Sequence, residues 1–204
     1  MGAWRRHASG HAGRDAGGWA ERQPGWARPE VRQEGVAASG KRLTAYASAG
    51  AHGCIAQALD LAGFGMAALR IIPVNDQYQM NSAALEQTFA ADRSAGFTPF
   101  FIAATAGSVD VGAIDDLTVL ADIALHEWLG FHVDGAYGAL AMLAPDIALR
   151  LNGIQRADSI AFDFHKWGQV PYDAGFILVR DGTMHSTIAS LPLQPICAAK
   201  PVAH

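Results

Sequence analysis

The chain alternates between short continuous apolar runs and longer segments in which apolar residues recur at helical spacing. Continuous apolar runs are typical of strands that are buried on both faces, as in parallel sheets covered by helices. The runs predict strands at residues 43–47, 69–74, 99–105, 131–134, 159–164 and 176–179. The segments between them predict helices at residues 52–61, 81–91, 115–128 and 146–152. This order predicts an α/β fold, with a mostly parallel sheet and helices on both faces.

Polar residues mark the starts of these helices. Asn81 or Ser82 suits the cap of the second helix, because a short polar side chain can accept a hydrogen bond from a free backbone N–H. Asp115 and Asp116 open the third helix, where carboxylates favour the positive end of the helix dipole. Gly63 follows the first helix and suits a helix stop.

Ligands of open α/β sheets bind beyond the carboxyl ends of the strands. The loops that follow three of the predicted strands are residues 106–112, 134–138 and 165–166. Asp134 ends one strand and Lys166 follows another, so the two side chains could face one pocket.

Lys166 lies beside Phe162, Phe164 and Trp167 in the sequence. Desolvation among such neighbours would lower the pKa of its amine and leave part of it as the free base. A free amine can form a Schiff base with an aldehyde. The alternative interpretation is a solvated lysine that blunts the end of a strand.

Composition narrows the function classes. The chain has 204 residues, of which 50% are hydrophobic and 17% charged, so it is long and apolar enough for a globular domain with a real core. Its net charge of -4 provides no basic stripe, and nucleic-acid binding is not expected. The weakly charged stretch 96–109 is too short for a membrane span, and no secretory signal is found.

The cysteines suggest neither a disulfide framework nor a zinc site, because Cys54 and Cys197 are the only two and stand far apart. A reducing, cytoplasmic location is therefore expected. A metal site built from His126, His132 and Asp134 is a weak alternative, since His126 lies on the preceding helix with no fixed geometry.

Five motifs in order resemble the group II pyridoxal-phosphate-dependent decarboxylases, the family of aromatic-amino-acid, tyrosine, histidine and glutamate decarboxylases. They are YASAGAHG at 46–53, ATAGSVDVGAIDD at 104–116, HVDGAYG at 132–138, GIQRADSIAFDFHKW at 153–167 and VPYDAGFILVRD at 170–181. The resemblance implies that residues 31–181 are the core of the large, cofactor-binding domain of a fold-type I enzyme, similar to aspartate aminotransferase but truncated. Residues 1–30, which we expect to be poorly ordered, and 182–204 match nothing in the family.

The resemblance also assigns roles around pyridoxal 5'-phosphate. Lys166 matches the lysine that holds the cofactor as an aldimine, and Asp134 matches the carboxylate that pairs with its ring nitrogen. His52 matches the histidine that stacks on the ring, and Ala136 the small residue on the opposite face.

Three further positions lie close to these motifs. His165 matches a histidine near the phosphate, and its alternative is simple packing on Trp167. Ser108 stands where the family usually has threonine, and its hydroxyl could still bind cofactor or substrate. Asp163 stands where animal members carry an amide, so the resemblance leaves its role open.

The implied reaction converts an amino acid to an amine, through a Lys166 aldimine and a quinonoid left by departing carbon dioxide. Relatives are dimers with sites at the subunit interface, so a homodimer is expected. Their phosphate-binding turn and catalytic mobile loop have no match in residues 1–30 or 182–204. Other fold-type I chemistry, such as aminotransferase or aldolase activity, and a non-catalytic truncated relative stay open as alternatives.

Overall fold

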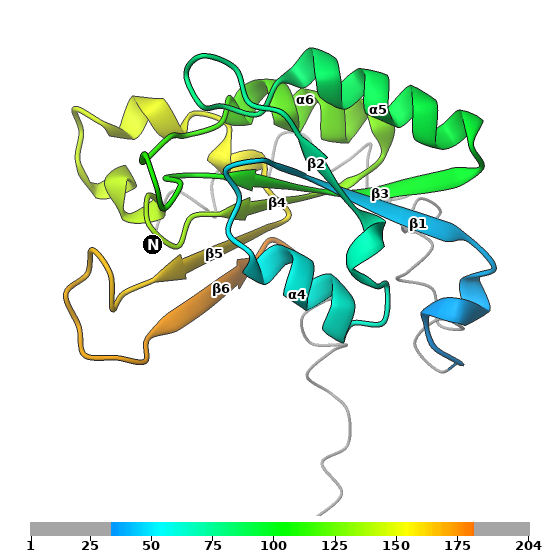
Figure 1. Cartoon of the computed structure of the whole chain (residues 1–204). Coiled ribbons are helices and arrows are strands. Elements are labelled where there is room, and N and C mark those ends of the chain that lie inside the picture. Colours follow the sequence, from blue (N-terminus) through cyan, green and yellow to red (C-terminus); the bar gives the residue numbers. More distant parts are fainter. Residues whose placement is uncertain (1–33, 182–204) are drawn as a thin grey trace, which may run out of the picture.

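The structure is a computed structural model that describes residues 34–181. Six strands form one sheet in the order β2-β1-β3-β4-β5-β6 (Figure 1). They are β1 (Arg42–Ser48), β2 (Leu69–Ile72), β3 (Phe97–Thr105), β4 (Gly130–Asp134), β5 (Ser159–Asp163) and β6 (Gly175–Val179). Neighbours run parallel, except that β6 is antiparallel to β5. The mostly parallel sheet is confirmed, while the predictions for residues 1–30 and 182–204 fall outside the described part.

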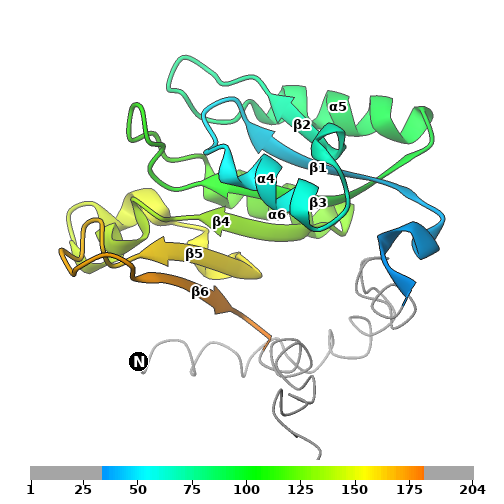
Figure 2. The same ribbon diagram turned by 60° about the horizontal axis from the view of Figure 1, so that its bottom comes forward.

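Helices cover both faces of the sheet, as predicted. The α-helices are α4 (Cys54–Leu61), α5 (Ser82–Ser94) and α6 (Leu117–Glu127). Figures 1 and 2 show α5 and α6 against one face and α4 against the other. No helix within residues 34–181 is both long and apolar enough to cross a bilayer.

Short 3-10 segments replace the predicted helix at 146–152. Only η5 (Ala148–Leu151) forms there, with Asn152 as its C-cap, and Gly153, with a φ of 99°, caps the start of the next 3-10 segment. A Cβ at Gly153 would lie 2.5 Å from the backbone of Leu117, so the chain turns where it meets the start of α6. The other 3-10 segments are η2 (Val36–Ser39), η3 (Met66–Ala68), η4 (Ala139–Leu143) and η6 (Ile154–Arg156).

Two aspartates that were predicted to open one helix have separate roles. Asp116 is the N-cap of α6 and accepts a hydrogen bond from the Val119 amide at 3.1 Å. Asp115 is buried outside the helix, where it accepts bonds from the amides of Met80 at 2.6 Å and Thr105 at 2.7 Å. Burial raises the pKa of Asp115, and these two bonds oppose the rise. The prediction that Asp115 opens the helix is therefore wrong. Its side chain instead joins the end of β3 to the loop that precedes α5.

The core has two parts, one on each face. The larger part packs α5 and α6 against the sheet through Leu85, Phe89, Leu117 and Leu120, among others. On the α4 face the cluster is smaller and consists of Leu43, Ala45, Leu59 and Phe100.

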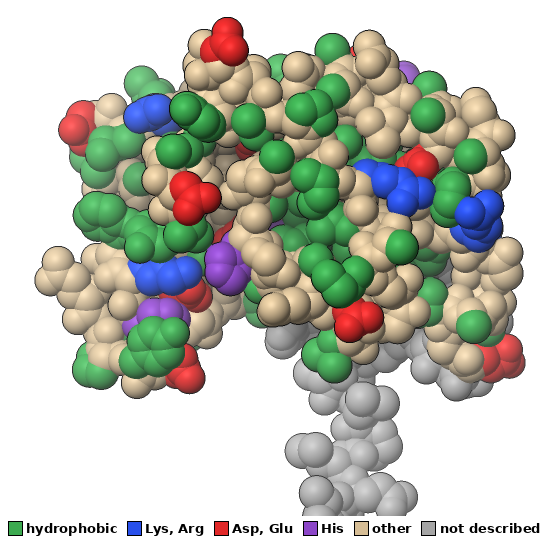
Figure 3. Space-filling model, viewed as in Figure 1, with side chains coloured by type: hydrophobic (Ala, Val, Ile, Leu, Met, Phe, Trp, Pro, Cys, Tyr) green, Lys and Arg blue, Asp and Glu red, His purple; other side chains and the backbone are tan. Residues whose placement is uncertain are grey.

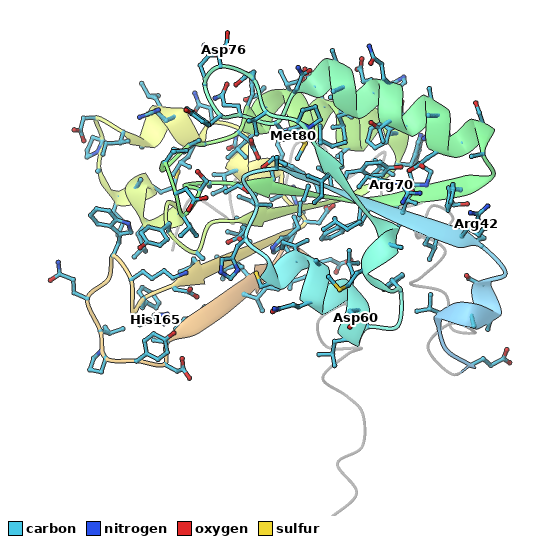
Figure 4. The ribbon with its side chains drawn as sticks, in the orientation of Figure 1. Arg42, Asp60, Arg70, Asp76, Met80 and His165 are labelled. Carbon is cyan, nitrogen blue, oxygen red and sulfur yellow. The ribbon has the colours of Figure 1, made fainter. Side chains whose placement is uncertain are left out.

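A polar network is buried between β1, β2 and α5. The Tyr46 hydroxyl donates to Asp92 Oδ2 at 2.7 Å and contacts Thr44 Oγ1 at 2.8 Å. Arg70 Nη2 pairs with Asp92 Oδ1 at 3.0 Å, and the guanidinium also lies over the ring of Phe97. Burial raises the pKa of Tyr46, so the phenol stays protonated and donates. Figure 4 shows Arg70 and Arg42 at the end of the sheet away from His165.

Replacing Asp92 with alanine is expected to lower the free energy of unfolding by about 3 kcal/mol, because it leaves the Tyr46 hydroxyl and the Arg70 guanidinium without their acceptor. Urea unfolding followed by circular dichroism measures the change. Asp122→Asn is the matched control, since Asp122 pairs with Arg156 at 2.7 Å but is 67% exposed. That variant should change the value by less than about 1 kcal/mol. Equal losses in the two variants would contradict the role of the network.

Candidate active site

The register of β3, β4 and β5 gathers polar side chains at one edge of the sheet. Thr105 ends β3 and pairs with Asp134 at the end of β4, which in turn pairs with Ala161 of β5. Side chains of paired residues in parallel strands share a face, and residues two apart on a strand do so as well. Thr105, Asp134 and Asp163 therefore lie at the carboxyl edge on one face. This is the face that carries α4.

Asp134 is half-buried and lightly bonded. Its Oδ1 accepts one hydrogen bond, from the Ala136 amide at 3.1 Å, and its other oxygen has no hydrogen-bond partner among residues 34–181. The hydroxyl of Thr105 is buried beside it and also has no partner within the described chain. A buried polar atom without a partner has a free-energy cost that a bound polar group can remove.

Two loops beyond these strands are pressed together. Gly138 donates its amide to the Ala106 carbonyl at 2.8 Å. A Cβ on Gly138 would collide with the Ala106 backbone, and one on Gly135 would lie 2.6 Å from the Ala139 methyl. Glycine is therefore required at position 138 for loop 134–138 to lie against loop 106–112, and at position 135 for the chain to pack against Ala139.

Ser108 organises its own loop. Its buried Oγ accepts a hydrogen bond from the Ala113 amide at 3.0 Å, and its carbonyl accepts from Gly112. The hydroxyl proton is still able to donate to a further group.

Lys166 follows β5 and points back to the strand end. Its Nζ lies 2.8 Å from Asp163 Oδ2 and 5.2 Å from the centre of the Tyr137 ring. The aromatic environment predicted from the sequence is wrong, because Phe162 and Phe164 instead pack with Phe176 at ring distances of 5.0 to 5.7 Å. Figure 3 shows basic, acidic and histidine side chains gathered over the β5–β6 connector.

His165 is fixed by the backbone of the same connector. Its Nδ1 accepts a hydrogen bond from the Ala174 amide at 3.0 Å, and its ring packs on Tyr172 at 4.4 Å. An accepting Nδ1 places the ring proton on Nε2, which lies 3.7 Å from Asp163 Oδ2. His165 therefore contacts Tyr172, and no ring contact with Trp167 is found in the described structure.

The start of α4 brings His52 to the same edge. His52 is exposed, and its Nδ1 accepts a hydrogen bond from the Cys54 amide at 3.2 Å. The pKa of the Cys54 thiol is raised, chiefly by burial and then by the Asp134 carboxylate, while Lys166 opposes the rise. These electrostatic contacts place the first turn of α4 next to Asp134 and Lys166.

The sequence-predicted residues thus converge, and three more join them. His52, Asp134 and Lys166 come from three different strand ends and lie around one edge. Thr105, Tyr137 and Cys54 were not predicted as site residues, although each lies inside or beside one of the quoted motifs. Thr105 stands two positions after a buried residue of its strand, and the alternation of side chains along a strand would have pointed to it.

A metal centre is not supported by the geometry. Residues 34–181 contain no group of three or more histidine, cysteine, aspartate or glutamate side chains placed to hold a metal ion. His126 pairs with Glu127 on α6, at 3.0 Å, and His132 Nδ1 contacts Ser159 Oγ at 2.8 Å.

The chain was compared with known proteins. Residues 25–192 match the model of the pyridoxal-dependent decarboxylase conserved domain. The chain belongs to this family. It is 38% identical to aromatic-L-amino-acid decarboxylase of Bacillus atrophaeus over 67% of its own length and 28% of the relative's. With histidine decarboxylase of Drosophila melanogaster the identity is 34%, over 85% of the chain and 19% of the relative.

Solved structures show the same fold. Mouse CSAD matches with a TM-score of 0.75 and 31% identity, over 79% of this chain and 34% of that one. Oryza sativa TDC with PLP and tryptamine matches with a TM-score of 0.71 and 32% identity, over 81% and 35%. The fold-type I assignment is confirmed, and this family member spans about a third of the length of these relatives.

His132 of this pyridoxal-dependent decarboxylase domain predicts a pH effect on stability. Burial lowers its pKa from 6.5, and Asp134 opposes the change. Below about pH 6.5 the unfolded chain therefore binds a proton that the folded chain does not, and the free energy of unfolding falls with pH. The loss approaches about 1.4 kcal/mol per pH unit until the lowered native pKa is reached.

The measurement is urea unfolding between about pH 7 and pH 5, with His132→Asn as the test variant and His126→Asn as the control. Asp115 and Asp158 have raised pKa values and act in the opposite direction, but they are present in all three proteins. We expect the difference in the free energy of unfolding between wild type and His132→Asn to shrink as the pH falls. A difference that stays constant would contradict the assignment.

Proposed function

We propose that this chain forms the cofactor core of a carboxy-lyase that uses pyridoxal 5'-phosphate to decarboxylate an amino acid to an amine. The observation that carries the proposal is the meeting of an amine, Lys166, and a carboxylate, Asp134, at neighbouring strand ends on one face of the sheet. The reaction would follow the course expected from the sequence, through a Lys166 aldimine and a quinonoid. When bound, the cofactor supplies the electron sink for the carbanion left by carbon dioxide.

The residues present fit this cofactor. The Lys166 amine can bond to its aldehyde carbon, and the unpartnered oxygen of Asp134 can accept a hydrogen bond from the protonated ring nitrogen. A carboxylate fixed at that position favours the protonated ring and stabilises charge that develops in the reaction. The buried Thr105 hydroxyl, which has no partner in the described chain, supplies a further polar contact beside Asp134.

The remaining residues would hold the two faces and the phosphate of the cofactor. His52 is anchored through Nδ1, so its ring is presented at the start of α4 and can stack. Ala136 adds only a methyl group next to Asp134, which leaves room for a flat ring on the other side. His165 carries its N–H on Nε2, 3.7 Å from Asp163 Oδ2, and would donate it to an anionic phosphate, while Ser108 retains its hydroxyl proton.

Substrate and assembly stay predictions. The curated relatives act on aromatic amino acids and histidine according to their names. The homodimer and the cytoplasmic location expected from the sequence are likewise untested.

The proposal predicts that the purified chain forms an imine with pyridoxal phosphate on Lys166. Absorbance of a protonated imine should appear on mixing, and borohydride reduction followed by peptide mapping should place the cofactor on the peptide that contains Lys166. The chain has only three lysines, at 41, 166 and 200, so the assignment is direct.

Lys166→Ala should abolish the band, whereas Lys41→Ala, at an exposed position, should leave it unchanged. Release of carbon dioxide and an amine from a panel of amino acids then tests catalysis, and a keto acid or an aldehyde as product would indicate the transaminase or aldolase alternative. An imine that survives Lys166→Ala would refute the site. Binding without turnover would support the non-catalytic relative.

A further inference from the structure

Asp163 is the charged residue at the site edge whose role the resemblance leaves open. It is the last residue of β5, and its side chain is 20% exposed. Oδ2 lies 2.8 Å from Lys166 Nζ, in a turn that the Lys166 amide closes on the Asp163 carbonyl. The end of the strand and this short turn therefore determine the positions of Asp163 and Lys166 relative to each other.

The space for this carboxylate is provided by the facing strand. Gly175 of β6 pairs with Asp163 across the antiparallel ladder. A Cβ at Gly175 would lie 3.1 Å from Asp163 Oδ1, which is tighter than ordinary contact. The absence of a side chain at Gly175 lets the carboxylate stand over the strand end and reach Lys166.

Lys166 is the only formal cation that compensates Asp163 within the described residues. The other basic neighbour is His165, whose Nε2 is 3.7 Å away. Because His165 Nδ1 accepts the Ala174 amide proton, the ring can become doubly protonated only if that hydrogen bond breaks. The shorter contact of Asp163 Oδ2 is the one to Lys166 Nζ, at 2.8 Å.

Two further groups near the Lys166 amine attract a positive charge. The Tyr137 ring faces Nζ at 5.2 Å, a cation–π distance, and Asp134 contributes a second negative charge nearby. The pKa of the Cys54 thiol is raised above its ordinary value, so this group adds no charge near neutral pH. An amine held in this way must lose a proton to solvent before its lone pair can attack a carbonyl carbon.

We propose that Asp163 is a positioning residue that holds the Lys166 amine as an ammonium ion and so limits how fast it condenses with an aldehyde. The proposal deepens the proposed function, because it concerns the same lysine. In the condensation, the ammonium ion gives its proton to water, the amine nitrogen bonds to the aldehyde carbon, and the aldehyde oxygen leaves as water.

The test uses the full chain without cofactor, so that it does not depend on pyridoxal phosphate binding. Formaldehyde with cyanoborohydride methylates lysines by the same condensation, followed by hydride reduction of the imine. Mass spectrometry of the digested chain gives the labelling rate of Lys166 relative to Lys41, which is exposed and serves as the internal reference.

Asp163→Asn removes the charge at constant shape, and we expect the relative rate at Lys166 to rise about fivefold near neutral pH, a factor typical of losing one partly exposed ion pair. In this variant the curve of the Lys166 labelling rate against pH should move to lower pH, while the curve for Lys41 stays in place. Asp163→Glu, which restores a carboxylate, should label at nearly the wild-type rate. In concentrated urea all three proteins should label alike.

An unchanged rate in Asp163→Asn would overturn the proposal, because the ion pair would then not control the amine. A slower rate would also overturn it and would show instead that the carboxylate assists proton removal. Failure of the pyridoxal phosphate experiment leaves this measurement intact, so the two proposals can fail separately.

Discussion

The register between β3, β4 and β5 is the constraint on which the site depends. Because Thr105 pairs with Asp134 and Asp134 with Ala161, three polar side chains reach the same edge on the same face. A shift by one residue in any of these strands would turn that strand's polar end to the α5 and α6 face, where the larger apolar core lies. Burial of that core, through residues such as Val133 and Ile160, therefore fixes the chemistry of the opposite face.

The apolar pattern predicts much of this arrangement, because strand ends are local features. The runs that end at Asp134 and near Lys166 identify both residues without knowledge of the contacts. The prediction that Lys166 lies among aromatic side chains is wrong for a simple reason. Side chains alternate along β5, so Phe162 packs with Phe176 on the face opposite Asp163, and the lysine reaches the carboxylate instead of the rings.

Long-range burial accounts for the other errors. Asp115 resembles a residue of the helix start because it stands beside Asp116. Its two hydrogen-bond donors, however, are the amides of Met80, which is distant in sequence, and Thr105, which lies on β3. Nothing in the local sequence marks the segment 146–152 as 3-10, since its path is set by the approach of Gly153 to Leu117. The unpartnered hydroxyl of Thr105 is likewise visible only in the folded chain.

The close contact between Gly138 and Ala106 has a consequence for the dynamics of the site. Two loops that share a backbone hydrogen bond and leave no space for a methyl group move as one body. The conformational entropy of ordering them is lost when the chain folds, so a ligand that enters between the strand ends does not have to order each loop in turn. Preorganisation of this part of the edge thus rests on Gly138, which does not need to touch the ligand.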